Sequence, residues 1–203
     1  MGRPSLQAER TYEIVLAASR CIARHGLSGA TLELIAKESG FSRGHIRYYV
    51  GNRDELIDLV VQNALEPYRN QFAELAELPG GPERVTALLD FLFGEGFQVS
   101  GDYRLFNALF QEVQRDQRLH DQMQVIYRRM QRSIEDTLVE SIDGASRPEC
   151  RLVAFALLCL TLGITDLALL SIYDDGQAMA RDVADSLVEQ MRVVSKKKIV
   201  RQG

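Results

Sequence analysis

The sequence has little of several features that mark common protein classes. It contains no tryptophan, and only three cysteines and five prolines among 203 residues. The cysteines form no CxxC pair, and an odd, scattered set predicts reduced, buried thiols in a cytoplasmic protein. No run alternates polar residues with β-branched apolar ones, so no strand is expected. The sequence therefore predicts an all-α protein.

Signatures of catalysis and of export are also missing. There is no P-loop, no glycine-rich dinucleotide loop and no nucleophile paired with a base. The first residues lead into a polar stretch, so no secretory signal is expected. Glu112, Asp116 and His120 are four apart, but the charged residues between them predict a surface loop rather than a metal site. An enzyme stays only as an alternative, and neither metal nor cofactor is expected.

Charge is small overall, at −4, but it is unevenly distributed. Residues 1–53 carry eight Lys or Arg against four Asp or Glu, whereas residues 54–195 carry twelve against twenty-four. Residues 196–203 add four basic residues, and we expect this basic tail to be disordered. The positive N-terminal part indicates an anionic partner, although chance variation over so short a segment would look the same.

Apolar residues recur at three- and four-residue steps along the chain, which predicts about nine amphipathic helices. The first three are expected at about 8–25, 31–38 and 42–49. The others are expected at about 53–77, 82–93, 102–114, 117–141, 148–172 and 176–194. Pro67 lies inside one of them, where a proline removes an amide donor and predicts a kink.

The spacing of the second and third helices is that of a helix-turn-helix, whose second helix enters a major groove. Thr31 and Ser42 occupy the N-cap positions, and Gly40 ends the second helix. The outward residues of the third helix suit DNA as a set, although each alone could be solvated surface, and Tyr49 could equally be core. The residues expected at double-stranded DNA are Arg3, Thr31, Ser42, Arg43, Gly44, His45, Arg47, Tyr48, Tyr49 and Arg53.

The stretch TYEIVLAASRCIARHGLSGATLELIAKESGFSRGHIRYYVGNRDELI, residues 11–57, resembles the DNA-binding region of the TetR family of bacterial regulators. The matching positions are Ala17, Ala18, Gly26, Thr31, Ile35, Ala36, Gly40, Ser42, Gly44, Ile46, Tyr49, Arg53, Asp54 and Leu56. Three of this chain's residues, Arg47, Val50 and Arg53, stand where members usually have Tyr, Phe and Lys. The stretches GHIRYYVGNRDEL and ITDLALL also resemble the betaine-operon repressors, which respond to choline.

The resemblance implies a DNA-binding domain at 1–51, a helical ligand-binding and dimerisation domain at 52–195 and a tail at 196–203. It implies a homodimeric repressor that binds a palindromic operator and is released by a small-molecule effector. Dimerisation is expected mainly through the last two helices. The expected interface residues are Leu157, Leu160, Ile164, Leu167, Val183, Leu187 and Met191.

The segment 152–173 is apolar nearly all round, with Asp166 as its single charged residue. Its length would allow it to span a bilayer. A central aspartate is costly there, however, and no belt of Trp or basic residues frames both ends. We therefore favour burial against a second copy of the chain and expect no membrane contact.

Six aromatic residues fall between residues 91 and 110. Aromatic faces with a carboxylate suit a cationic ligand, although the same rings could be ordinary core. Asp166 is the candidate carboxylate because an acid in an apolar helix needs a partner; it could equally bond across a dimer interface. The expected pocket residues are Phe91, Tyr103, Phe106, Phe110, Tyr127, Phe155 and Asp166.

Overall fold

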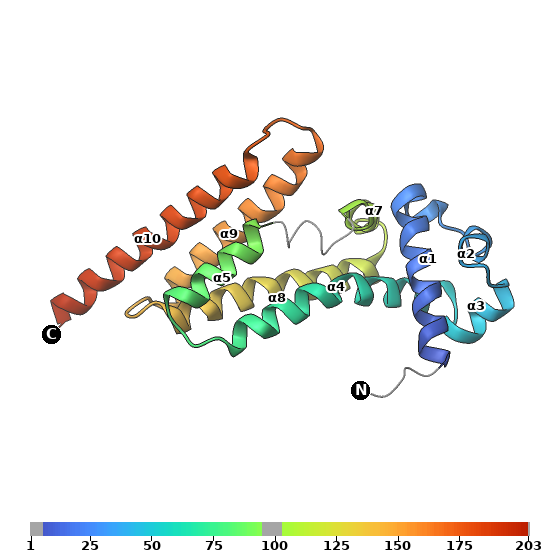
Figure 1. Cartoon of the computed structure of the whole chain (residues 1–203), viewed down its shortest axis with the longest axis horizontal. Helices are drawn as coiled ribbons and strands as arrows, with labels where there is room; N and C mark the ends of the chain where they lie inside the picture. The colour runs from blue at the N-terminus through green and yellow to red at the C-terminus, as the bar shows by residue number, and fades with distance from the viewer. Residues whose placement is uncertain (1–5, 95–102, 203) are drawn as a thin grey trace. The chain divides into compact units, whose positions relative to one another are not determined.

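The computed structural model describes residues 6–94 and 103–202, in which α-helices are the only regular secondary structure (Figure 1). The expected all-α fold is confirmed, and the predicted bounds 53–77, 82–93 and 117–141 are reproduced. The helices are α1 (Leu6–Gly29), α2 (Leu32–Ser39), α3 (Arg43–Val50), α4 (Arg53–Glu77), α5 (Pro82–Phe93), α7 (Tyr103–Glu112), α8 (Gln117–Ser141), α9 (Arg147–Leu169) and α10 (Gly176–Gln202).

The chain divides into two compact units. The first comprises residues 1–67 and 101–121, and the second comprises residues 68–100 and 122–203. The division predicted at residue 51 lies inside the first unit, in part because α7 packs on α1. The division at residue 51 does not separate the compact units. It stays a prediction of where the DNA-binding part ends and the ligand-binding part begins.

The first unit is built around α1, which contacts α2, α3 and α7. The inward face of α1 is apolar, and five of its side chains are 2% exposed or less: Ile14, Ala17, Ala18, Cys21 and Ile22. Gly26 breaks the helix with a φ of 71° and a ψ of 168°, where the sequence predicted its end. Arg20 and Arg24 bind the carboxylate of Glu38 at 2.8 and 3.2 Å and so join α1 to α2.

The second unit contains α5, α9 and α10, the part of α4 from Tyr68 onward and the part of α8 from Gln122 onward. α10 packs along α9 and α5, and α5 also contacts α9 (Figure 1). Arg84 of α5 binds Glu140 of α8 at 2.6 Å. The largest fully buried side chains of the second unit are those of Leu75, Leu88, Leu89, Leu92, Ile134 and Leu138.

Residues 196–202 of the basic tail are helical, so the expectation of disorder from residue 196 is wrong for this described part. α10 continues to Gln202. Lys198 lies 2.5 Å from a carboxylate oxygen of Glu149 at the start of α9. Ile199 packs against Gly144, where an added Cβ would meet its Cδ1 at 2.7 Å. These contacts with the α8–α9 connection hold the last turns, and they are long-range contacts that a run of lysines does not predict.

α4 continues through Pro67 as one helix, and the boundary between the compact units falls between Pro67 and Tyr68. A kink at Pro67 that serves as a hinge stays a prediction.

α9 has one buried and one uncovered apolar face. Among the described residues, its segment Arg147–Ala168 is long and apolar enough to cross a membrane by length and composition, a test that core helices of soluble proteins also pass. Leu157 is fully buried, whereas Leu152 and Phe155 are 69% and 56% exposed. Cys159 is exposed as well, so the prediction of three buried thiols holds only for Cys21 and Cys150. An apolar surface therefore remains uncovered in the isolated chain.

Candidate DNA-binding surface and ligand site

α3 presents two different faces. Ile46 and Val50 are 0% and 5% exposed, and the helix contacts α1 and α2. On the other face Arg43, His45, Arg47 and Tyr48 are all exposed. The helical spacing predicted this outward orientation, which leaves two guanidinium groups, an imidazole and a phenol available to a partner.

The N-caps of α2 and α3 are formed as predicted. The hydroxyl of Thr31 accepts a hydrogen bond from the Leu34 amide, and that of Ser42 accepts one from the His45 amide, both at 3.2 Å. Each replaces an intrahelical partner that a first-turn amide lacks. Gly44 follows on an exposed part of α3, where its missing Cβ leaves the helix backbone open to close approach.

Tyr49 is half-buried and performs the packing role that the sequence left open. Its ring lies edge-on to Phe41 and Tyr48, with centroids 6.2 and 5.1 Å away. Its carbonyl accepts a hydrogen bond from the Thr11 hydroxyl at 3.4 Å, which ties α3 to α1. The guanidinium of Arg10 lies 5.5 Å from the centroid of the Phe41 ring. A contact of Tyr49 with DNA stays a prediction.

Arg53 has an intramolecular partner. Its guanidinium donates a hydrogen bond to the Leu27 carbonyl, so it joins the start of α4 to the end of α1. The sequence predicted a phosphate contact, and the structure adds a positioning role. Arg3 lies outside the described residues.

An aromatic cluster lies within the second unit, formed by Tyr68 and Phe72 of α4 with Phe91 of α5. The Phe91 ring meets those of Tyr68 and Phe72 edge-on, with centroids 6.4 and 5.3 Å away. Burial, with smaller contributions from the charges of Tyr68 and Asp166, raises the pKa of Tyr127 on α8 to about 12. Tyr68, Tyr127 and Asp166 are therefore close enough to interact electrostatically, and these three groups are called one neighbourhood below. That neighbourhood combines aromatic rings with one carboxylate.

The structure places the other predicted pocket residues differently. Asp166 is exposed in the isolated chain, so its role as the pocket carboxylate or as a group that bonds across a dimer interface stays a prediction. Phe155 is also exposed, on the uncovered face of α9. Phe106 and Phe110 are on α7 in the first unit, and the side chain of Tyr103 lies outside the described residues.

Tyr68 and Phe72 are the residues that sequence reasoning missed for this site. Their four-residue spacing puts both on one face of α4. Nothing local distinguishes a pocket ring from a core ring, since only packing against Phe91 brings them to the cluster.

The predicted interface residues are of three kinds. Leu157 and Met191 are 0% and 6% exposed, because they face the interior of the single chain. A side chain without accessible surface cannot bury more on association, so these two are poor interface candidates. Leu167 and Val183 are exposed. The partly covered members of the set are Leu160, Ile164 and Leu187.

Within residues 6–94 and 103–202 there is no group of three or more His, Cys, Asp or Glu arranged to hold a metal ion. Asp116 instead caps α8, where its carboxylate accepts hydrogen bonds from the Arg118 and Leu119 amides at 3.0 and 3.1 Å.

Two parts of the chain match known protein families. Residues 14–60 match the family model for bacterial regulatory proteins of the tetR family. Residues 82–193 match the model for the C-terminal part of BetI-type transcriptional repressors. The HTH-type transcriptional regulator BetI of Vibrio campbellii is 28% identical over 168 residues, which cover 81% of each chain.

Solved structures share the fold. A transcriptional regulator from Saccharomonospora viridis, solved in complex with choline, superposes with a TM-score of 0.72 at 20% identity, over 90% of this chain and 96% of that one. A TetR transcription regulator from Haloarcula marismortui gives a TM-score of 0.75 at 19% identity, over 91% and 98%. The chain therefore belongs to the TetR family of bacterial transcriptional regulators, with a BetI-type C-terminal domain, and is a regulator rather than an enzyme.

Proposed function

We propose that the chain is a cytoplasmic, homodimeric repressor that binds a palindromic operator and is released from it by a small cationic effector. The observation that carries the DNA-binding part is the division of α3 into a buried face and an exposed face. Ile46 and Val50 fix the helix, while its opposite side offers only groups that hydrogen-bond or carry charge. A guanidinium can bind guanine edges or phosphates, and a helix of this size fits a major groove.

The decisive experiment measures DNA binding. Duplexes are selected from a random pool with the wild-type chain, and affinity is then followed by fluorescence anisotropy against salt concentration. We expect the logarithm of the association constant for DNA to fall steeply with the logarithm of the salt concentration, because phosphate contacts release counterions. Arg43→Ala should weaken operator binding by about 1–3 kcal/mol and relax preference at one base pair, if Arg43 reads a guanine.

Arg128→Ala is the matched control, since Arg128 is an exposed arginine on α8 outside the α3 face. It should leave operator affinity unchanged. A chain that binds no DNA at low salt would overturn the proposed function. An equal loss on operator and random DNA for Arg43→Ala would assign Arg43 to phosphate.

Dimerisation is supported by the uncovered face of α9. Leu152 and Phe155 are exposed large apolar side chains on a helix that is long and apolar, and contiguous patches of this kind mark interfaces. Two α3 copies in one dimer would then reach half-sites about 34–36 Å apart. Phe155→Asp should give a monomer by sedimentation equilibrium and lose operator binding. Val125→Asp, which changes a comparably exposed side chain on α8, should stay dimeric.

The effector is assigned to the aromatic cluster. Rings at Tyr68, Phe72 and Phe91, together with the Tyr127 and Asp166 neighbourhood, suit an organic cation held by ring faces and a carboxylate. The BetI-type match and the choline-bound relative support choline as the first compound to test.

Calorimetry with choline and with its uncharged carbon analogue, 3,3-dimethyl-1-butanol, tests this assignment. We expect choline alone to bind and to lower operator affinity, and Asp166→Asn to lose the preference for the cation. Equal binding of the two compounds would contradict a charge-selective site.

A further inference from the structure

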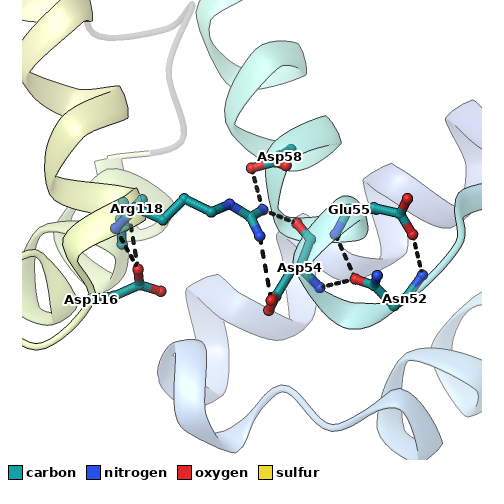
Figure 2. A network of polar contacts seen from close by, with 7 residues as sticks. Asn52, Asp54, Glu55, Asp58, Asp116 and Arg118 are labelled. Atoms are coloured by element: carbon teal, nitrogen blue, oxygen red, sulfur yellow. Dashed lines mark hydrogen bonds and ion pairs between the residues drawn. The ribbon is translucent and has the colours of Figure 1, made fainter.

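A single arginine joins the starts of two helices inside the first unit (Figure 2). The contacts of Arg118 with Asp54 and Asp58 are called the clasp below. Arg118, in the first turn of α8, pairs with both Asp54 and Asp58 of α4, with its Nη1 3.3 Å from Asp54 Oδ2. Its guanidinium also donates a hydrogen bond to the Asp54 carbonyl. The two carboxylates are four residues apart and so lie on one face of α4, where one fork-shaped group reaches both.

Both turns joined by the clasp are fixed by their own N-caps. Asn52 Oδ1 accepts hydrogen bonds from the Asp54 and Glu55 amides at 2.8 and 3.0 Å, and Glu55 accepts one from the Asn52 amide at 2.7 Å. Asp116 caps α8 in the same way. A contact between two capped turns restrains their orientation more than a contact between two frayed ends would.

The start of α4 follows α3, the proposed recognition helix, directly in the chain. Only Gly51 and Asn52 separate the end of α3 from the start of α4. Gly51 has a φ of 79° and a ψ of −142°, backbone angles that residues with a side chain rarely adopt. Restraint of the first turns of α4 is therefore passed to α3 through a short corner.

We propose that Arg118 is a positioning residue for operator recognition: it holds the first turns of α4, and thereby the recognition helix α3, without contacting DNA. This proposal rests on the proposed DNA-binding function. It adds Arg118, which is far from α3 in the sequence, to the residues on which operator recognition depends. Other contacts also attach this part of the chain. α7 packs on α1 with Leu105 and Leu109 buried, the Ser28 hydroxyl donates a hydrogen bond to Glu112 at 3.4 Å, and Arg53 binds the Leu27 carbonyl. The contacts of Arg118 are the ones that join the start of α4 directly to the start of α8.

The expected effect is moderate because the clasp is partly exposed. The side chains of Arg118, Asp54 and Asp58 are 43%, 68% and 30% exposed, so water and salt screen the pairs. Arg118→Ala should weaken operator binding by about 3- to 10-fold, the range that a few partly exposed charge pairs supply.

Anisotropy titrations compare wild type and Arg118→Ala on the selected operator and on a random duplex. Arg118→Ala should lose affinity for the operator only, with an unchanged salt slope, because a positioning residue neutralises no phosphate. Arg115→Ala is the control; this neighbouring arginine is 78% exposed and lies 3.7 Å from Glu112. The exchanged pair Arg118→Asp with Asp58→Arg should bind better than either single variant.

Hydrogen exchange gives a readout that needs no DNA. Amides of residues 56–60 should exchange faster in Arg118→Ala, while those of residues 14–22 in α1 stay protected. Unchanged operator affinity, an equal loss on both DNAs or unchanged exchange would each overturn the inference. A wild-type chain that binds no DNA would overturn the proposed function and the recognition role with it, whereas the exchange result would still report separately whether Arg118 holds α4.

Discussion

Gly51→Ala should be strongly destabilising, because the corner between α3 and α4 demands glycine for two reasons. The backbone at Gly51 has φ 79° and ψ −142°, and holding a residue with a side chain there costs about 1–3 kcal/mol. An added Cβ would also lie 2.0 Å from Glu55 Oε2 and 2.7 Å from its Cδ. Glu55 would have to leave the Asn52 amide, a capping bond worth about 1 kcal/mol. Together these predict a loss of about 2–4 kcal/mol.

Thermal unfolding followed by circular dichroism measures this loss. For a chain of this length, about 2–4 kcal/mol corresponds to a fall in Tm of about 5–15 °C. Gly44→Ala is the control, because Gly44 is in a regular helix and its added Cβ would have Ser42 Oγ at 3.8 Å as the nearest atom. In a Glu55→Ala background, Gly51→Ala should cost less, since only the backbone strain remains. An unchanged Tm for Gly51→Ala would refute the reasoning.

Three further predictions concern other parts of the chain. Gly44→Ala should stabilise the fold by about 0.5–1 kcal/mol yet weaken operator binding, because its methyl group would stand where the α3 backbone approaches DNA; unchanged affinity would rule out that approach. Hydrogen bonds from Lys198 and Ser146 lower the pKa of Glu149 from its ordinary 4.5 to about 2. The contribution of the ionised Glu149 to stability is therefore present above about pH 4.5 and lost as the pH falls toward 2. In Glu149→Gln the Tm should change less with pH over that window than it does in the wild type. Pro67→Ala should change induction by the effector while leaving operator affinity without effector similar; unaltered induction would contradict a hinge at Pro67.

Local chemistry accounts for the part of the structure that the sequence predicted well. The periodicity of α1 places Ile14 and Ile22 in the core, and the hydroxyls of Thr31 and Ser42 cap the helices that follow them. These features depend on residues within four positions of one another, so they can be recognised without knowing the fold. The outward face of α3 follows from the same periodicity.

The least predictable features join residues that are distant in the sequence. Arg118 is an ordinary charged residue until α8 meets α4, and Lys198 belongs to a basic run until it meets Glu149. Burial is subject to the same limit, because on α9 the apolar side chains of Leu157 and Phe155 look alike in sequence but point to the core and to the surface.

The sequence by itself determined the helical character of the described residues, the helix-turn-helix and the exposed face of α3, since short-range periodicity and capping decide them. Only the tertiary structure decided which rings gather around Phe91, which apolar face of α9 stays uncovered and which carboxylates Arg118 holds. Each of these depends on the distance between side chains from different helices, and that distance is set by packing rather than by spacing along the chain.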